Sequence, residues 1–210
     1  MRLQENSIKE NKDMNIKKEL EKNVGVSNDI YLNNIDISPS AIKAIMINEV
    51  VPSDPLQDFY GLPDADYLKT TIPLLQGAGA AVSSIQDILQ MGIYITNAVK
   101  TPKTEYAIDK SSIESSLPYL EAELSLFPNT KVIMLMGDVA KKAFNMITKK
   151  STKKNAVPAV STYKLRNSEL YYKGIRVMPS YIMTGGNILI EKSKVAMATE
   201  DIAIMLEIIK

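Results

Sequence analysis

The sequence contains no cysteine and no histidine. Without cysteine the chain forms no disulfides, thiolate zinc sites or iron–sulfur clusters, and it has no cysteine nucleophile. Without histidine it lacks the commonest metal ligand and the usual general base near neutral pH. We therefore expect neither a metal site nor a cofactor.

Long hydrophobic runs are also missing. The longest uncharged run, residues 70–86, contains Pro73, Gly77 and Gly79, so it does not predict a transmembrane helix. The N-terminus lacks the unbroken apolar segment of a signal peptide. The 210 residues, 45% hydrophobic and 23% charged, predict one substantial globular domain with a tail. We expect a cytoplasmic protein.

Positive charge is concentrated in one part of the chain. Residues 141–194 hold twelve Lys or Arg and two acidic residues, a net charge of +10, whereas the other residues, 13 basic and 22 acidic, carry −9. Such a split is typical of a polyanion-binding face, although a solvated lysine-rich surface gives the same count. The candidates for contacts to nucleic acid are Lys149, Lys150, Lys153 and Lys154.

The first 24 residues carry eleven charges. The i, i+4 spacing of Ile16, Leu20 and Val24 indicates a short amphipathic helix. We interpret this helix as an appendage and not as part of the core. Residues 25–40, rich in Asn, Asp and Ser, predict an extended connection. The predicted division is an extension over residues 1–35 and a domain over residues 36–210.

After Ser40 apolar strand patterns alternate with helical patterns. The predicted strands are Ile42–Val51, Ile93–Val99, Lys131–Met136 and Ile175–Met178, and the predicted helices are Tyr67–Gln76, Ser84–Met91, Ser111–Phe127, Asp138–Thr148 and Lys194–Ile209. A hairpin is expected from Ser161–Asn167 and Leu170–Lys173. Near-continuous apolar strands separated by helices predict an α/β fold with a parallel sheet covered on both faces.

Ligands of such sheets bind at the carboxyl ends of the strands. Polar residues gather at four such ends, which are 49–52, 97–100, 137–138 and 179–184. Glu49 ends a buried strand, where a carboxylate is costly unless it is paired or functional. Asn97 interrupts an apolar strand, and its amide both donates and accepts, as reading a base edge requires. Both residues are also compatible with structural roles, as a capped glutamate and a backbone-bonded asparagine.

Weaker signals surround these two residues. Phe59 and Tyr60 follow a proline turn and would suit stacking on a planar ligand, but such aromatics also anchor loops in the core. Gly137-Asp138 would suit anion binding at a helix N-terminus. The chain has no phosphate-binding loop, no dinucleotide fingerprint and no nucleophile elbow.

The arrangement of these segments resembles the uracil-DNA glycosylase superfamily, and is most similar to the bacterial and archaeal branch whose first motif reads Gly-Glu-Ala-Pro-Gly. The resemblance runs from about Ile42 to Ile209. Its most specific stretch is Ile93-Tyr-Ile-Thr-Asn97-Ala-Val-Lys100-Thr-Pro102, and it continues through Leu117–Leu124 and Lys131–Ala140. The segment Asn48-Glu49-Val-Val-Pro52 is similar to the first motif.

The resemblance implies a three-layer α/β/α sandwich with a mainly parallel central sheet. It also implies an enzyme that flips a damaged base, usually uracil, out of DNA and hydrolyses its N-glycosidic bond. Glu49 would position or activate water and stabilise the sugar cation, and Asn97 would bind the pyrimidine edge. The other implied substrate-binding residues are Phe59 or Tyr60 as the stacking ring, the motif residues Pro52 and Lys100, and Ser180, Tyr181 and Thr184 of the final motif.

The sequence departs from that family in two ways, because it has neither histidine nor cysteine. The final motif usually supplies a histidine that stabilises the departing base, and here Ser180, Tyr181 or Thr184 would have to donate instead. The cysteines that bind an iron–sulfur cluster in that branch are missing, and Thr101 stands at one of their positions. The alternatives to an enzyme acting on DNA, whether duplex or single-stranded, are a non-catalytic nucleic-acid- or nucleotide-binding protein and a hydrolase of free nucleosides.

Overall fold

A five-stranded sheet forms the centre of the computed structural model, which describes residues 13–105 and 107–210. The strand order is β4-β3-β5-β7-β6. The first four strands of that order are parallel and β6 is antiparallel to β7. The strands are β3 (Ala44–Val50), β4 (Ile93–Val99), β5 (Val132–Met136), β6 (Leu170–Tyr172) and β7 (Ile175–Ser180). The prediction of a mainly parallel sheet is confirmed.

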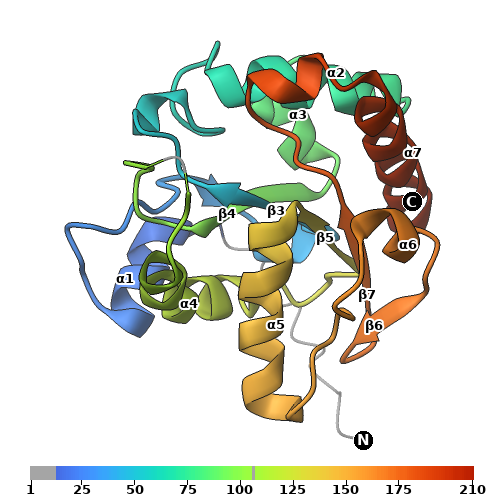
Figure 1. Ribbon diagram of the computed structural model, residues 1–210. Coiled ribbons are helices and arrows are strands. Elements are labelled where there is room, and N and C mark those ends of the chain that lie inside the picture. Colours follow the sequence, from blue (N-terminus) through green and yellow to red (C-terminus); the bar gives the residue numbers. More distant parts are fainter. Residues whose placement is uncertain (1–12, 106) are drawn as a thin grey trace, which may run out of the picture.

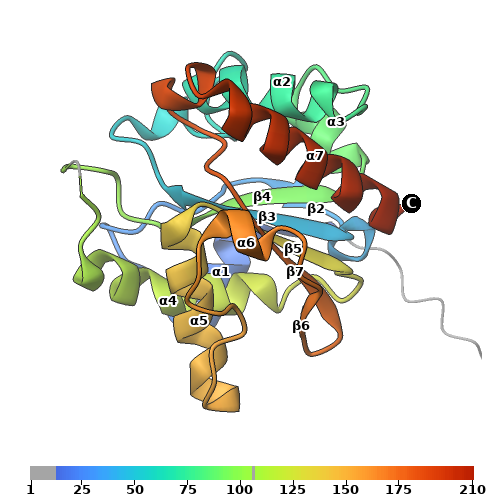
Figure 2. The same cartoon turned by 45° about the vertical axis from the view of Figure 1, so that its right-hand side comes forward.

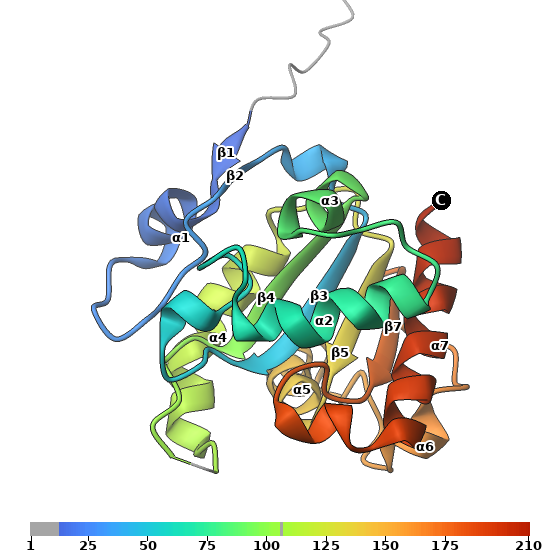
Figure 3. The same ribbon diagram turned by 90° about the horizontal axis from the view of Figure 1, so that it is seen from above.

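Helices cover both faces of the sheet, as Figures 1 and 2 show. One layer contains α2 (Asp66–Gly77), α3 (Ile85–Gln90) and α7 (Lys192–Ile209), which lie in front of the strands in Figure 3. The opposite layer contains α1 (Ile16–Val24), α4 (Lys110–Leu124) and α5 (Asp138–Thr152). The three-layer α/β/α sandwich is therefore present.

Alternation along the strands explains how each strand serves both layers. Ile45 and Ile47 of β3 belong to the core cluster beneath α4 and α5, whereas Ala44 and Met46 belong to the cluster beneath α2 and α7. Successive side chains of a strand point to opposite faces, so a strand buried on both faces must be apolar throughout. The sheet consequently has two cores, and polar side chains appear at its carboxyl edge.

Side-chain caps set the starts of two helices. Ser84 and Asp87 form a reciprocal capping box at the start of α3. Asp109 accepts a hydrogen bond of 2.6 Å from the Ser112 N–H at the start of α4. Such caps satisfy N–H groups that have no partner within the helix.

The N-terminal helix is part of the core, which corrects its interpretation as an appendage. Strand β1 (Met14–Asn15) pairs with β2 (Asp36–Ile37), and α1 follows β1 directly. Ile16 and Leu20 are fully buried in the same cluster as the sheet residues. The expected i, i+4 stripe is real, and its apolar side chains gain free energy by packing on the domain. The domain boundary at residue 35 stays a prediction, and residues 1–12 lie outside the described residues.

The expected hairpin is wrong in its first arm. Residues Thr162–Leu165 form a one-turn helix, α6, whose buried residues Thr162 and Leu165 have i, i+3 spacing and do not alternate. The hairpin instead joins β6 to β7 through Lys173 and Gly174, with φ of 50° and 81°. Two consecutive positive φ values are typical of a type I′ turn, which fits the twist of the strands.

No helix within the described ranges combines the length and the apolar character that crossing a membrane requires.

Candidate functional site

Glu49 lies near the end of β3 against the start of α5. Its Oε1 accepts a hydrogen bond of 3.0 Å from the Val139 N–H. This N–H belongs to the first turn of α5, where the backbone donors have no acceptor within the helix. Gly137 precedes α5 with φ of 111°, and a Cβ there would lie 2.4 Å from Glu49 Oε1. The glycine is therefore needed for the close approach of the glutamate, and the helix N-terminus is occupied by a side chain of the protein itself.

Burial raises the pKa of Glu49, and the nearby carboxylate of Asp138 raises it further. Hydrogen bonds from the N–H groups of α5 and the charge of Lys103 act in the opposite direction without cancelling the effect. A carboxyl group whose pKa moves toward neutral pH is better suited to exchange protons than an exposed glutamate.

A cavity of about 460 Å³ opens beside Glu49 at the carboxyl ends of β3, β5 and β7. Its volume falls in the range of small-molecule sites. Ser180 and Tyr181 line it from the end of β7, α6 forms another wall, and Lys141 and Lys194 contribute cations. The sequence-predicted residues Glu49, Ser180 and Tyr181 thus share one cavity, whereas Asn97 is not among its lining residues.

Two residues behind Ser180 were missed by sequence reasoning. Ser180 Oγ donates a hydrogen bond of 2.5 Å to Asp201 Oδ2, and Arg166 Nε lies 2.9 Å from Asp201 Oδ1. Because its proton is directed at Asp201, the Ser180 hydroxyl has only lone pairs to offer a ligand. A signal was present, since Asp201 falls on the buried stripe of α7 with Ala198 and Ile202.

Asn97 lies on the other side of the sheet from Glu49, bonded to side chains. Its Nδ2 donates to Asp58 Oδ2 at 2.8 Å, and its Oδ1 accepts from Asn48 Nδ2 at 2.8 Å. Asn48 Oδ1 in turn accepts from Thr184 Oγ1 at 3.0 Å. Asn48 and Asn97 are register partners on adjacent strands, so Glu49 is only one residue from this pair. Two asparagines in neighbouring apolar strands were the available signal for Asn48, whereas nothing in the proline turn marked Asp58.

The two candidate stacking rings have different surroundings. Phe59 is buried and its ring centroid lies 5.2 Å from that of Tyr67. Tyr60 is partly buried, and its hydroxyl accepts a hydrogen bond from the Ile95 N–H of the edge strand β4. Tyr60 also stacks on Tyr94. Neither ring lines the cavity beside Glu49.

Lys100 forms a buried ion pair outside the cavity. Its Nζ lies 2.6 Å from Glu123 Oε2 and also donates to Thr96 Oγ1 and the Asn97 carbonyl. These three acceptors use all three N–H donors of the ammonium group. Pro52 is half-buried just beyond β3.

The four lysines proposed for nucleic acid are exposed at the C-terminal end of α5, at the bottom of Figure 2. Glu49 lies at the opposite end of this 15-residue helix, about 20 Å away at 1.5 Å per residue. Lys150 is paired with Glu121 at 3.1 Å, and Lys153 has the left-handed conformation that ends the helix. The structure thus separates these lysines from the cavity.

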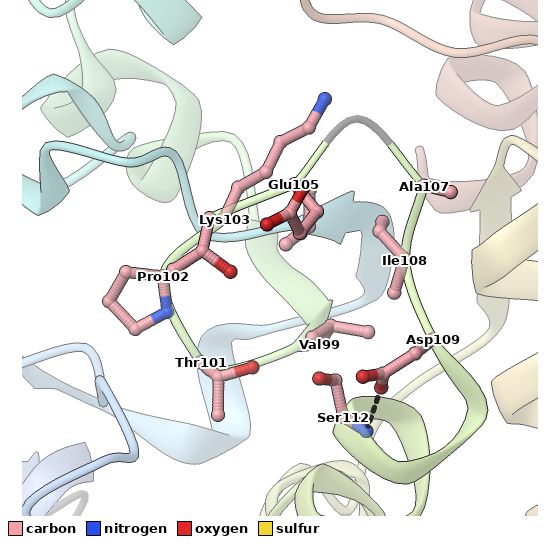
Figure 4. A pocket seen from close by; sticks show the side chains of 11 residues that line it. Val99, Thr101, Pro102, Lys103, Glu105, Ala107, Ile108, Asp109 and Ser112 are labelled. Atoms are coloured by element: carbon pink, nitrogen blue, oxygen red, sulfur yellow. Dashed lines mark hydrogen bonds between the residues drawn. The ribbon is translucent and has the colours of Figure 1, made fainter.

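A second hollow at the ends of β3 and β4 is much smaller. Figure 4 shows Val99, Thr101 and Pro102 on one side of it and Asp109 and Ser112 of the α4 start on another. Its volume is about 50 Å³, well below the size of ligand sites. Thr101, which stands where a cysteine was expected from the resemblance, therefore borders no ligand-sized space there.

Comparison with known proteins identifies the superfamily. The model of the uracil DNA glycosylase superfamily matches residues 46–187, which include Glu49, Asn97 and the segment Met178–Thr184. No curated protein matches the chain. The match covers more than half of the sequence, and the α/β/α sandwich agrees with it. The chain belongs to the uracil DNA glycosylase superfamily.

Proposed function

We propose that the protein is a DNA N-glycosylase that flips a deaminated or otherwise damaged base from DNA and hydrolyses its N-glycosidic bond. The observation that carries the proposal is a carboxylate with a raised pKa, Glu49, in a cavity of about 460 Å³ at the carboxyl edge of the sheet. Membership of the uracil DNA glycosylase superfamily supports DNA as the partner. Extrusion of the base is needed because the reacting bond is inaccessible within a duplex.

Glu49 would act on the sugar side of the bond. The Val139 N–H holds one of its oxygens, so the carboxylate has a fixed orientation toward the cavity. It would orient the attacking water, accept a proton from it, and stabilise the positive charge that develops on the sugar. Charge stabilisation by a preorganised group costs no reorganisation when the bond breaks.

Asn97 would bind the edge of the flipped base, with Phe59 as the stacking ring. Both side chains are buried outside the cavity beside Glu49, so the loop after β3 would have to move to admit the base. Among the described residues Asn97 uses one of its two N–H donors and one of its two carbonyl lone pairs. One donor and one acceptor remain for a pyrimidine edge. Phe59 is next to Asp58 in sequence, and Asp58 is hydrogen-bonded to Asn97. Tyr60 is instead committed to the β4 backbone.

Tyr181 would replace the missing histidine as donor to the departing base. The other two candidates have directed their protons elsewhere, Ser180 to Asp201 and Thr184 to Asn48. The Tyr181 hydroxyl makes no hydrogen bond to any described residue, and Tyr181 lines the cavity. Tyr181 is partly buried, and Lys194 Nζ lies 5.9 Å from its ring centroid.

The lysines at the end of α5 would bind the DNA backbone at a distance from the flipped base. About 20 Å corresponds to roughly six base pairs at 3.4 Å each. The cations nearer the cavity, Lys141 and Lys194, would face the closest phosphates.

A second candidate function is a non-catalytic nucleic-acid- or nucleotide-binding protein on the same fold. It is favoured by the absence of histidine together with the committed hydroxyls of Ser180 and Thr184, which leave few donors for a departing base.

A substrate panel separates the two functions. Duplex and single-stranded oligonucleotides that contain uracil, hypoxanthine, xanthine or an oxidised pyrimidine are incubated with the full chain, and abasic sites are cleaved with alkali. The glycosylase proposal predicts strand cleavage for at least one of these bases and none for an undamaged oligonucleotide. Binding of the oligonucleotides without cleavage of any would replace it by the binding-protein function.

A further inference from the structure

A chain of four hydrogen-bonded side chains crosses the carboxyl edge of the sheet. Asp58, Asn97, Asn48 and Thr184 are linked in that order by bonds of 2.8, 2.8 and 3.0 Å. They come from the loop after β3, from β4, from β3 and from the segment after β7. The four side chains are at most 5% exposed, so the bonds are shielded from solvent.

The chemistry at one end fixes the direction of every bond. An ionised carboxylate only accepts hydrogen bonds, so Asp58 must face the Nδ2 of Asn97. The Oδ1 of Asn97 then faces Asn48 and accepts from it, and the Oδ1 of Asn48 must accept the Thr184 proton. A rotation of the Asn97 amide would set its carbonyl against the carboxylate and two N–H groups against each other.

We propose that Asp58 is a positioning residue that locks the Asn97 amide in one orientation and thereby selects the base edge that Asn97 accepts. The selection rests on the function proposed above. On the locked amide the free positions are an Nδ2 donor and an Oδ1 acceptor, which complement the carbonyl and ring N–H of uracil. Cytosine offers an amino donor and a ring acceptor in those places, so the same amide meets a donor with a donor and an acceptor with an acceptor. A rotated amide would accept cytosine instead.

Asp58 is the group that controls the orientation of the Asn97 amide, because the other ionisable groups around it are either paired with each other or neutral. Lys100, just after β4, and Glu123 of α4 both act on Asp58, and they form an ion pair with each other. Asp58 also interacts with Tyr31, Tyr60 and Tyr67, whose pKa values are all raised. These three phenols therefore stay neutral through the physiological range.

Burial raises the pKa of Asp58 from 3.8 to about 6, although Asn97 and the Phe59 N–H stabilise its charge. The carboxylate is thus ionised at pH 7.5 and largely protonated at pH 5. A protonated Asp58 can donate as well as accept, so the lock operates above this pKa and is released below it. Burying the charged Asp58 carboxylate costs free energy. This cost is consistent with a role for the charge, because only the ionised carboxylate is restricted to accepting hydrogen bonds from Asn97.

The first test measures the lock directly by NMR. The side-chain N–H₂ signals of Asn97, assigned by their loss in Asn97→Ser, are followed from pH 5 to pH 7.5 in the full chain. They should shift with a midpoint near 6, and the shift should vanish in Asp58→Asn but persist in Asp54→Asn. Asp54 is the matched control because it is an exposed aspartate in the same loop that caps a short helix. Signals that do not respond to pH, or respond equally in Asp58→Asn, overturn the proposal.

The second test measures the consequence at pH 7.5 by fluorescence anisotropy. Two single-stranded oligonucleotides that differ only in one base, dU or dC, are bound to wild type, Asp58→Asn and Asp54→Asn. Asp58→Asn should lower the preference for dU by roughly 5- to 150-fold, the size of one bidentate discrimination, by gaining affinity for dC. An unchanged preference in Asp58→Asn overturns the role in selection. A wild type with no preference, together with Asn97 signals that titrate with Asp58, refutes the proposed recognition of a uracil-type base and leaves the lock established.

Discussion

Two carboxylates at the same edge of the sheet have different environments. Burial raises the pKa of both Glu49 and Asp58. Glu49 is half-buried, bonded to a helix N–H, and faces a cavity. Asp58 is buried and is bonded to the Asn97 amide and to the Phe59 N–H. It does not line the cavity beside Glu49.

The difference shows that a raised pKa alone does not identify a catalytic group. What a carboxylate's charge can do depends on whether solvent and substrate reach it and on which groups it is bonded to. Glu49 can meet a water molecule and a substrate, so its charge can act on a reacting bond. Asp58 meets only its own protein, so its charge can act by orienting a neighbour.

The largest expected effect separates the two carboxylates by rate. Glu49→Gln keeps an oxygen that accepts from Val139 but removes the charge, so base release should slow by about 10²- to 10⁴-fold with DNA affinity unchanged. Single-turnover assays and anisotropy measure the two quantities. Glu114→Gln, an exposed glutamate of α4, is the control. A fully active Glu49→Gln would refute the assignment of the catalytic carboxylate.

Tyr181→Phe tests whether Tyr181, which lines the same cavity as Glu49, donates to the departing base. Loss of one preorganised donor should reduce the single-turnover rate by about 10²- to 10³-fold while leaving the fold intact. Tyr171→Phe, an exposed tyrosine on β6, should leave the rate unchanged. Equal rates in the two variants would exclude Tyr181 as the replacement for histidine.

The Asp58 side of the comparison is tested by stability. The folded-state pKa of about 6 lies above the unfolded value of 3.8, so the wild type is favoured at low pH and loses that advantage as the pH rises through 6. Relative to Asp58→Asn, its free energy of unfolding should fall by about 2 kcal/mol between pH 4 and pH 7.5. Urea unfolding at several pH values measures this difference. A difference independent of pH would mean that Asp58 has the same pKa in the folded and unfolded states, so that burial does not raise it.

Asn97→Asp links the two sites. The new carboxylate would have no donor for a uracil carbonyl and would lie against Asp58, so the two acids would share a proton. Uracil binding should weaken by about 1–3 kcal/mol, and cleavage should fall with it. Anisotropy with a dU oligonucleotide gives the binding loss, and an unaltered affinity would remove Asn97 from the recognition of the base.

The smallest effect is expected at the far end of α5. Alanine at Lys149, Lys150, Lys153 and Lys154 should make the log–log salt slope for a long duplex less steep by up to about 0.9 per lost contact. Short single strands should bind as before, because the lysines lie about 20 Å from the cavity. Lys18→Ala and Lys22→Ala on α1 provide the control. An unchanged slope would leave the lysine cluster as a solvated surface.

The sequence predicts the layers of the fold well because the strands are apolar on both faces. The run Ile93–Val99 is buried along its whole length, and the predicted bounds of β4 match the structure. The α6 segment was mistaken for a strand because one helical turn has too few residues to show a period. The role of α1 was missed because eleven charges in residues 1–24 obscured two buried side chains.

The site is less predictable because its residues meet only through register and loops. Glu49 and Ser180 are marked by their positions at strand ends and share a cavity. Asp58 and Asn48 are of interest because they are hydrogen-bonded to Asn97. No sequence pattern predicts the strand register that pairs Asn48 with Asn97. The direction of the Ser180 proton likewise depends on Asp201, which is 21 residues away.

Release of free base from DNA is the most direct test of the proposed glycosylase activity. The purified chain is mixed in excess with a uracil-containing duplex, and mass spectrometry follows free uracil while alkaline cleavage follows the abasic strand. Both products are expected to appear together at one rate in wild type, and this rate should fall by about 10²-fold or more in Glu49→Gln. Duplex that stays bound and intact, with no free base from uracil or from any other damaged base in the panel, would contradict this activity.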